Sequence, residues 1–369
     1  MKQLVAPYIE ALKPYVPGKP IEALRRERGI EGEILKLASN ENPLGPSPMA
    51  LAAVPAALKE AHFYPDGAQL ALRARLAEKL GVGVERVVAG NGSNELIELI
   101  IRAFCVPGDT AIVSEYAFAI YGICMQTHGV EFTRVPMRDP LTHDLAAMAE
   151  AVTEETRLVW IANPNNPTGT YNARAELVAF LDRLGERGVS PLVIVDEAYF
   201  ECVDAEDFPD SIALHDRYEG LITLRTFSKG YGLAAFRVGY AVTASEEVAG
   251  YLHRIRAPFN VGRVAQAVAL AALEDTPYLE RSLAQIVAGK AQLLKLLADI
   301  GVDAIPSQTN FLFCRTPRPA AEVFDAMLDH GVIVRPLGGF GLPDGLRITI
   351  GLPEQNVRVA DVLRQVLGR

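Results

Sequence analysis

The feature that most limits the possible folds is a series of short, almost wholly apolar segments, each followed by polar residues. These segments are residues 86–89, 110–113, 157–162, 192–195, 220–224 and 238–242. Continuous apolar character is typical of strands in a mostly parallel sheet that helices cover on both faces. The carboxyl ends of such strands are where open α/β sheets bind ligands. The pattern therefore predicts an α/β protein with a binding site along one edge of the sheet.

One of these segments leads directly to a lysine with unusual neighbours. Thr226 and Ser228 stand within three residues of Lys229, and Arg237 follows before the next apolar segment. An amine beside hydroxyl donors and a fixed cation suits a phosphorylated carbonyl cofactor, because the amine can condense with the aldehyde while the other groups hold the phosphate. For a single Ser-Lys pair, a surface lysine in a glycine-rich loop is the alternative.

An aspartate and a glycine-rich turn follow two other segments. Asp196 comes directly after residues 192–195, and a buried carboxylate needs a cation or a donor. A protonated pyridine nitrogen is such a partner, whereas a helix N-cap is the alternative role. Gly90-Asn91-Gly92 stands before a helix expected from Leu96, and it could free backbone N–H groups for a phosphate. This turn lacks the third glycine of a dinucleotide fingerprint. Gly81-Val82-Gly83 is followed by Glu85-Arg86 and fails the same fingerprint, which argues against a nicotinamide dehydrogenase.

The composition excludes several classes of protein. Of the 369 residues, 50% are hydrophobic and 22% are charged, so an ordinary globular core can be filled. The net charge of −9 argues against nucleic acid as a partner. We expect neither a signal peptide nor a membrane span, because no apolar run is long enough. The four cysteines have no metal-type spacing, so we expect no metal site and a reducing, cytoplasmic location.

The two ends of the chain differ from its centre. Pro14, Pro17 and Pro20 prevent a long helix near the start. From residue 264 a helical stretch restarts at Pro277 and leads to short strands near 310–314, 332–335 and 346–350. We therefore expect an N-terminal arm over residues 1–35, a large domain over 36–263 and a small α+β domain over 264–369.

Several motifs resemble those of one enzyme family, the fold type I (class I and II) aminotransferases, which use pyridoxal 5′-phosphate. They are residues 163–169 (NPNNPTG), 196–199 (DEAY), 228–229 (SK) and 237–240 (RVGY). Within the family, the chain most resembles the histidinol-phosphate aminotransferase subfamily. That likeness rests on residues 14–19 (PYVPGK), 37–43 (LASNENP), 64–67 (YPDG), 90–93 (GNGS) and 346–349 (LRIT).

The resemblance implies a fold, an assembly and a reaction. The large domain would hold a mostly parallel seven-stranded sheet between helices, and two chains would form a homodimer with shared active sites. The enzyme would move an amino group between L-histidinol phosphate and 2-oxoglutarate, giving glutamate, in histidine biosynthesis. An aromatic amino acid aminotransferase is the alternative, with Phe118, Tyr121 and Phe236 as apolar wall. A decarboxylase of the same superfamily would share the cofactor site.

The resemblance also implies a role for each matching residue. Lys229 would bind the cofactor covalently and later carry a proton, and Asp196 would pair with the pyridine nitrogen. Asn166 and Tyr199 would hydrogen-bond the phenolic oxygen of the ring, and Phe118 would stack on the ring. The phosphate would be held by the backbone of Gly92, Ser93 and Asn94, by Thr226, Ser228 and Arg237, and by Tyr64 of the partner subunit.

The substrate would meet a second set of side chains. Arg335 and Arg347 lie in apolar strands of the small domain, where an arginine usually needs an anionic partner. They would bind an anion at the substrate end opposite the amine, whereas a local salt bridge is the alternative. Tyr15 in the arm would help to close this pocket, and Asn40 would line it.

Four places depart from the family pattern. Asn94 stands where aspartate is more usual, and Ala235-Phe236 replaces a smaller, glycine-containing pair. Phe118 lacks a tyrosine hydroxyl, and Gly262-Arg263 replaces small polar residues. We expect the last two departures to affect the substrate pocket.

Overall fold

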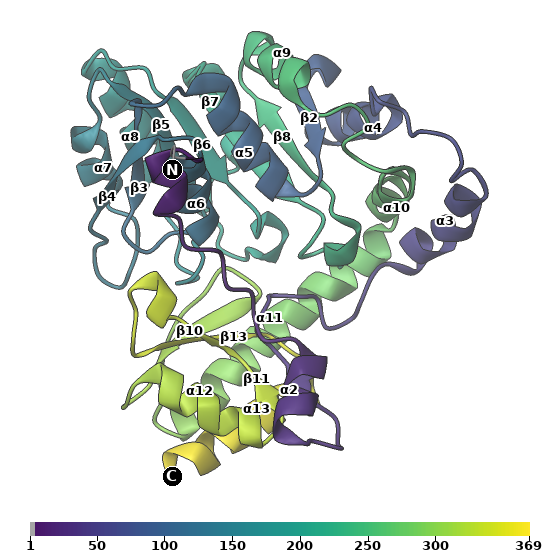
Figure 1. Ribbon diagram of the computed structural model, residues 1–369, viewed down its shortest axis with the longest axis vertical. Coiled ribbons are helices and arrows are strands. Elements are labelled where there is room, and N and C mark those ends of the chain that lie inside the picture. Colours follow the sequence, from purple (N-terminus) through teal and green to yellow (C-terminus); the bar gives the residue numbers. More distant parts are fainter. Residues whose placement is uncertain (1–3) are drawn as a thin grey trace.

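The computed structural model describes residues 4–369, which form a larger and a smaller part around two sheets (Figure 1). The larger part holds a seven-stranded sheet in the order β2-β8-β7-β6-β5-β3-β4. Its strands are β2 (Val87–Gly90), β3 (Thr110–Ser114), β4 (Glu131–Val135), β5 (Thr156–Ala162), β6 (Leu192–Asp196), β7 (Leu221–Thr226) and β8 (Gly239–Thr243). Only β8 runs antiparallel to its neighbours. The mostly parallel seven-stranded sheet expected above is confirmed.

Helices cover both faces of this sheet, which explains why its strands are continuous apolar runs. Strand β5 illustrates the arrangement: Trp160 packs into one buried cluster with Ile97 and Tyr121, whereas Val159 packs on the opposite face with Phe180. The helices of the larger part are α3 (Pro48–Lys59), α4 (Leu70–Leu80), α5 (Ser93–Phe104), α6 (Ala119–Thr127), α7 (Leu145–Ala151), α8 (Arg174–Glu186), α9 (Glu246–Ile255) and α10 (Arg263–Glu274).

Two elements of the larger part differ from the sequence-based expectations. The edge strand β4 has no long apolar run, because Glu131, Thr133 and Arg134 are exposed, so the apolar pattern does not predict it. Helix α5 begins at Ser93 rather than at Leu96. Gly92 is its N-cap with φ of +76°, a conformation that favours glycine. The earlier start brings the N–H groups of the first helical turn to the end of β2.

The smaller part is built on an antiparallel sheet in the order β12-β13-β10-β9. Its strands are β9 (Asp303–Ile305), β10 (Phe311–Arg315), β12 (Arg335–Pro336) and β13 (Gly345–Thr349), and its helices are α12 (Ala320–Asp329) and α13 (Pro353–Leu367). The long helix α11 (Thr276–Asp299) connects the two parts (Figure 1) and carries Pro277 in its first turn, as expected. Strand β1 (Leu35–Lys36) pairs with β11 (Val332–Ile333), so it associates with the smaller part.

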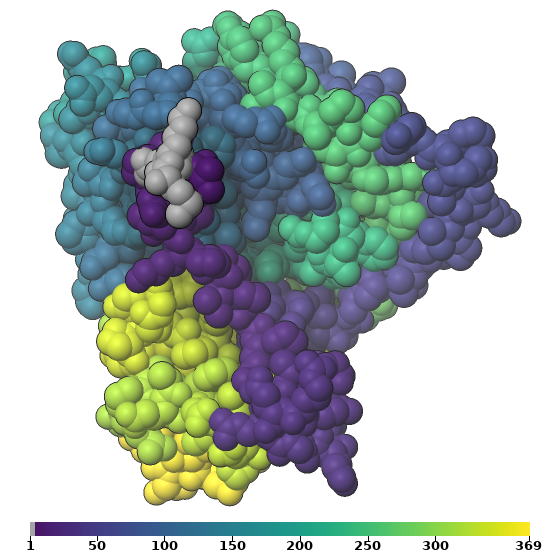
Figure 2. Space-filling view, in the orientation of Figure 1, coloured from purple at the N-terminus to yellow at the C-terminus, as the bar shows by residue number. Residues whose placement is uncertain are grey.

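The arm lies across the front of both parts, as the purple surface of Figure 2 shows. It contains α1 (Pro7–Glu10) and α2 (Ile21–Arg28), and residues 1–3 of the expected arm lie outside the described residues. Arg28 on α2 donates to Asp325 at 2.5 Å and to Asp329 at 2.8 Å, both on α12. Within residues 4–369, no helix combines the length and the apolar character needed to cross a membrane.

Short 3-10 helices complete the elements. They are η1 (Val84–Arg86), η2 (Phe200–Cys202), η3 (Ser211–Arg217), η4 (Ala234–Phe236) and η5 (Gly338–Phe340).

Candidate active site

A cavity of about 330 Å³ lies between the carboxyl ends of β5, β6 and β7 and the strands β12 and β13 of the smaller part. The parallel strands bring their carboxyl ends to one edge, which explains why polar residues from distant segments meet there. All the site residues predicted from the sequence line this cavity except Gly92 and Tyr64. The cavity is therefore the candidate active site.

Lys229 follows the end of β7 and extends its amine into the cavity. Its Nζ donates a hydrogen bond to the backbone oxygen of Ser39 at 3.1 Å. Burial, and after it the positive charge of Arg347, lowers the pKa of Lys229 to about 8. Near neutral pH, a larger share of this amine is uncharged and nucleophilic than of an ordinary lysine amine.

Asp196 is buried at the end of β6 and has two donors. Its Oδ2 accepts a hydrogen bond from the Tyr121 hydroxyl at 2.6 Å, and its Oδ1 accepts one from the Ala198 N–H at 3.1 Å. Burial raises the pKa of Asp196 to about 6, and the Tyr121 hydrogen bond opposes that rise. The next helix, η2, begins at Phe200 with Tyr199 as its N-cap, so the N-cap alternative for Asp196 is wrong.

Tyr121 is the site residue whose role the sequence analysis missed. The sequence predicts it only as apolar wall, but its hydroxyl is bonded to Asp196. Its ring stacks on Trp160 with centroids 4.8 Å apart and meets the edge of Phe118 at 5.7 Å. The aromatic cluster that follows β3 was a visible signal, but nothing in the spacing linked it to an aspartate 75 positions away.

Arg347 is buried in the wall of the cavity and is held by uncharged groups. Its Nη1 donates to Oδ1 of Asn166 at 2.6 Å, and its Nη2 donates to the backbone oxygen of Ala38 at 2.7 Å. Its Nε has no partner, and no Asp or Glu of residues 4–369 forms an ion pair with it. The salt-bridge alternative is therefore wrong for Arg347, and the burial of this unpaired charge lowers its pKa.

Arg335 lies nearer the surface and contacts the arm. Its Nη2 donates to the backbone oxygen of Val16 at 2.8 Å. Its guanidinium carbon lies 5.8 Å from the ring centroids of both Tyr15 and Phe340. In the described part of the chain it also has no carboxylate partner, so both arginines keep their positive charge available to a ligand.

Asn40 and Tyr199 form a hydrogen-bonded pair beside Lys229. The Asn40 Nδ2 donates to the Tyr199 hydroxyl oxygen at 2.8 Å, and burial raises the pKa of Tyr199 to about 12. Asn40 also has φ of +56°, which is uncommon for a residue other than glycine. Strained backbone of this kind is typical of functional sites, where the surrounding structure maintains it.

An anion cradle is formed where α5 begins. Arg237 approaches so closely to Gly92 that a Cβ on that glycine would overlap the guanidinium group. The Arg237 Nη1 lies 3.5 Å from the Ser228 hydroxyl, which in turn accepts from Thr226 at 3.0 Å. A helix N-terminus, two hydroxyls and a guanidinium together suit a phosphate group.

Tyr64 lies outside this cavity. Its side chain is 78% exposed, and its ring stacks on Phe259 with centroids 4.6 Å apart. It lines a second cavity together with Phe236 and Arg263. The expectation that Phe236 forms apolar wall beside Lys229 is therefore wrong. Arg263 likewise does not line the Lys229 cavity, because it pairs with Glu60 and donates to the backbone oxygen of Tyr64.

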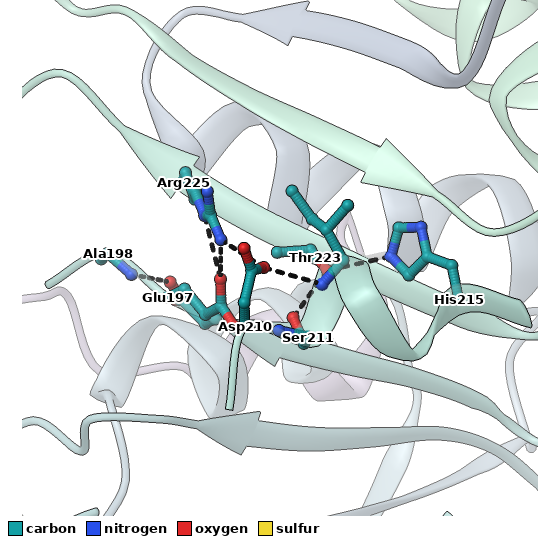
Figure 3. Close-up of polar contacts among 9 residues, drawn as sticks. Glu197, Ala198, Asp210, Ser211, His215, Thr223 and Arg225 are labelled. Atoms are coloured by element: carbon teal, nitrogen blue, oxygen red, sulfur yellow. Dashed lines mark hydrogen bonds and ion pairs between the residues drawn. The ribbon is translucent and has the colours of Figure 1, made fainter. Parts of the chain in front are cut away.

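A buried ionic network ties β6 to β7 beside the candidate site (Figure 3). Arg225 on β7 donates to Oε2 of Glu197 at 2.9 Å and 2.8 Å and to Asp210 at 2.7 Å. Oε1 of Glu197 accepts from the Ser211 N–H at 2.8 Å. Because Glu197 follows Asp196 directly, this network fixes the ends of the two strands that carry the site.

Comparisons with known proteins agree with this geometry. The family model described as aminotransferase class I and II matches residues 32–362. A histidinol-phosphate aminotransferase of Anaeromyxobacter sp. (strain Fw109-5) is 46% identical over 366 residues, covering 99% of each chain. One of Bacillus subtilis (strain 168) is 44% identical, covering 98% of this chain and 99% of its own. The crystal structure of histidinol-phosphate aminotransferase from Sinorhizobium meliloti in complex with pyridoxal-5′-phosphate is 30% identical, with a TM-score of 0.89, covering 100% of this chain and 98% of that one.

Proposed function

The chain belongs to the family of class I and II aminotransferases, and we propose that it moves an amino group between L-histidinol phosphate and 2-oxoglutarate with pyridoxal 5′-phosphate as cofactor. This reaction would place it in histidine biosynthesis. The observation that carries the substrate assignment is the unpaired, buried Arg347 beside Lys229.

The residues of the cavity fit the cofactor. Lys229 supplies an amine for its aldehyde, and the buried carboxylate of Asp196 can pair with the pyridine nitrogen. Asn166 and Tyr199 would bind the phenolic oxygen, and Phe118 would lie against the ring. The cradle of Gly92, Ser93, Asn94, Thr226, Ser228 and Arg237 would hold the phosphate. When bound, the cofactor supplies an aldehyde that takes up the amino group and a ring that withdraws electrons from the reacting carbon.

The side chains around the cofactor would then carry out three tasks. The Nζ of Lys229 would take a proton from the substrate carbon that bears the amine and deliver it to the cofactor carbon that carried the aldehyde, as a general acid–base group already in place. Asp196, while ionised, would stabilise positive charge on the pyridine nitrogen. Tyr15 and Arg335, which both line the cavity and lie close to each other, would shield it from water.

Charge is the basis for the choice of substrate. Arg347 and Arg335 offer two cationic groups without carboxylate partners in the described residues. Histidinol phosphate carries a phosphate, and 2-oxoglutarate and glutamate carry carboxylates, so the same basic wall can serve both half-reactions. An aromatic amino acid has less support, because Phe236 lines another cavity and the Tyr121 hydroxyl is bonded to Asp196.

A panel of amino donors tests this proposal. The purified enzyme would be assayed with 2-oxoglutarate and histidinol phosphate, histidinol, phenylalanine or tyrosine, with Lys229→Ala as the inactive control. We expect the highest kcat/KM for histidinol phosphate. Faster turnover of phenylalanine or tyrosine would contradict the substrate assignment while leaving the family assignment intact.

Borohydride reduction tests the cofactor assignment separately. Reduction followed by peptide mapping should place a pyridoxyl group on Lys229, since its amine is the one that extends into the cavity. A label on any other lysine would contradict the central role of Lys229.

We also place the enzyme in the cytoplasm as a homodimer with shared sites. Support for the dimer comes from Tyr64, which is exposed beside the exposed Phe63 in the second cavity. Mixing Tyr64→Phe with Lys229→Ala subunits should create hybrid dimers with one intact site and one doubly altered site. Activity per intact lysine should then exceed that of Tyr64→Phe alone. No such gain would mean that the sites are not shared.

A further inference from the structure

The loop that joins β1 to α3 bonds both the side-chain amine and the backbone oxygen of Lys229. The Ser39 backbone oxygen accepts from the Lys229 amine, as described above. Three residues further along the same loop, the Nδ2 of Asn42 lies 3.3 Å from the backbone oxygen of Lys229 and 3.0 Å from that of Gly230. The loop thus contacts both the reactive tip and the backbone of the same lysine.

Ser282 on α11 strengthens this contact. The Asn42 Nδ2 donates to the Ser282 Oγ at 2.6 Å, and the Ser282 hydroxyl donates to the backbone oxygen of Gly230 at 2.9 Å. Ser282 is fully buried, so its hydroxyl is withdrawn from water. The Asn42 Oδ1 accepts from the Leu44 N–H at 3.0 Å, which fixes the orientation of the amide. Every polar atom of the Asn42 side chain is therefore engaged.

A turn hydrogen bond also holds the backbone at Lys229. Strand β7 ends at Thr226, and the Lys229 backbone oxygen accepts from the Gly232 N–H at 3.0 Å, so Asn42 and Ser282 add side-chain bonds to a turn that lies beyond the sheet. Neither Asn42 nor Ser282 lines the cavity, so neither would touch cofactor or substrate. An effect of theirs on the reaction would pass through the position of Lys229 or through the loop that carries Ser39 and Asn40.

We propose, on the basis of the proposed function, that Asn42 and Ser282 are positioning residues that hold the Lys229 backbone so that its amine reaches the reacting carbon. A displacement of a catalytic group by about 1 Å can cost about 100-fold in rate. Asn42 and Ser282, which together form a clamp on the backbone of Lys229 and Gly230, would therefore act on the proton-transfer step and leave substrate binding unchanged.

The first measurement follows the half-reaction with histidinol phosphate by the absorbance of the bound cofactor. Asn42→Ala should slow this step about 10- to 100-fold, with KM changed by less than about threefold. Ser282→Ala, which removes one donor and leaves Asn42 in place, should give a smaller loss in the same direction. Ser47→Ala is the matched control, because Ser47 caps α3 and bonds Asp275 without contacting Lys229, and it should keep the wild-type rate. A rise in KM with an unchanged rate would overturn the proposal.

The second measurement asks whether the effect passes through the lysine. In Lys229→Ala, methylamine added to the solution can replace the missing amine, and it needs no clamp. Adding Asn42→Ala to this background should therefore leave the methylamine-dependent rate unchanged. An equal loss with and without the lysine would overturn the proposal, because Asn42 would then act elsewhere.

A third measurement uses the cofactor-free protein and does not depend on the substrate. Acylation of Lys229 as a function of pH reports how freely its amine reaches solvent. In Asn42→Ala and in Ser282→Ala, labelling should become faster and its midpoint should move toward that of an ordinary lysine. Identical labelling in wild type and both variants would overturn the proposal. If the panel of amino donors showed a better donor than histidinol phosphate, by contrast, only the proposed substrate would be refuted.

Discussion

Replacing Arg347 by methionine tests the anion-binding wall most directly. Arg347 is 7% exposed, and its guanidinium is fixed by Asn166 and Ala38 and has an Nε without a partner. Nη1 and Nη2 each carry a second hydrogen, which could donate to a phosphate or carboxylate. Arg347→Met keeps an unbranched apolar stem of similar length and removes the charge.

The size of the effect follows from burial. Losing one partner of a buried, hydrogen-bonded charge pair costs about 2–5 kcal/mol, and about 1.4 kcal/mol is a factor of ten. The kcat/KM for histidinol phosphate should therefore fall roughly 30- to 4,000-fold. Leaving the Asn166 oxygen and the Ala38 carbonyl without donors costs about 1–3 kcal/mol of stability for each group, which removal of an unpaired buried charge partly offsets.

The assay compares substrates with and without the anion. Histidinol lacks the phosphate, so Arg347→Met should lower its kcat/KM by about fivefold or less. Thermal unfolding and cofactor absorbance check that the variant is folded and loaded. Arg157→Met is the matched control, because Arg157 is exposed at the opposite end of β5. Equal losses for histidinol and histidinol phosphate would refute the role of Arg347 as an anion ligand.

Three further predictions concern buried ionisable groups. In cofactor-free protein, the unfolded state keeps a proton on Lys229 up to its ordinary pKa of 10.5, whereas the folded state loses it near pH 8. The free energy of unfolding should therefore rise by about 2–3 kcal/mol from pH 8 to 10.5. Denaturant titrations measure this rise, and Lys229→Met should abolish it. In the cofactor-free protein, Tyr121→Phe removes a donor to ionised Asp196, so the pKa of that carboxyl should rise by about one to two units above its present value of about 6 when it is titrated by NMR. An unchanged pKa would contradict the role of that hydrogen bond. Arg225→Met leaves Glu197 buried without its cation and should cost about 3–5 kcal/mol of unfolding free energy, and adding Glu197→Gln should recover part of the loss in the same titrations.

Much of the fold could be predicted because its signals are local. Six of the seven strands of the large sheet were visible as apolar runs, since both of their faces are buried. The seventh, β4, lies at the edge and carries exposed polar residues, so no run marked it. Lys229 and Asp196 could likewise be located as candidates, because each follows a buried strand closely and a buried charged group is costly unless it has a partner.

The sequence by itself thus determined six of the strands of the large sheet and the set of polar groups at their ends. Only the tertiary structure decided which of these groups are paired. The bonds of Tyr121 to Asp196, Arg347 to Asn166 and Asn42 to Lys229 join residues 75, 181 and 187 positions apart. Such contacts leave no periodic or compositional signal in the sequence, because they arise where elements far apart in the chain pack together. The unpaired charge of Arg347 and the clamp on the Lys229 backbone are properties of that packing.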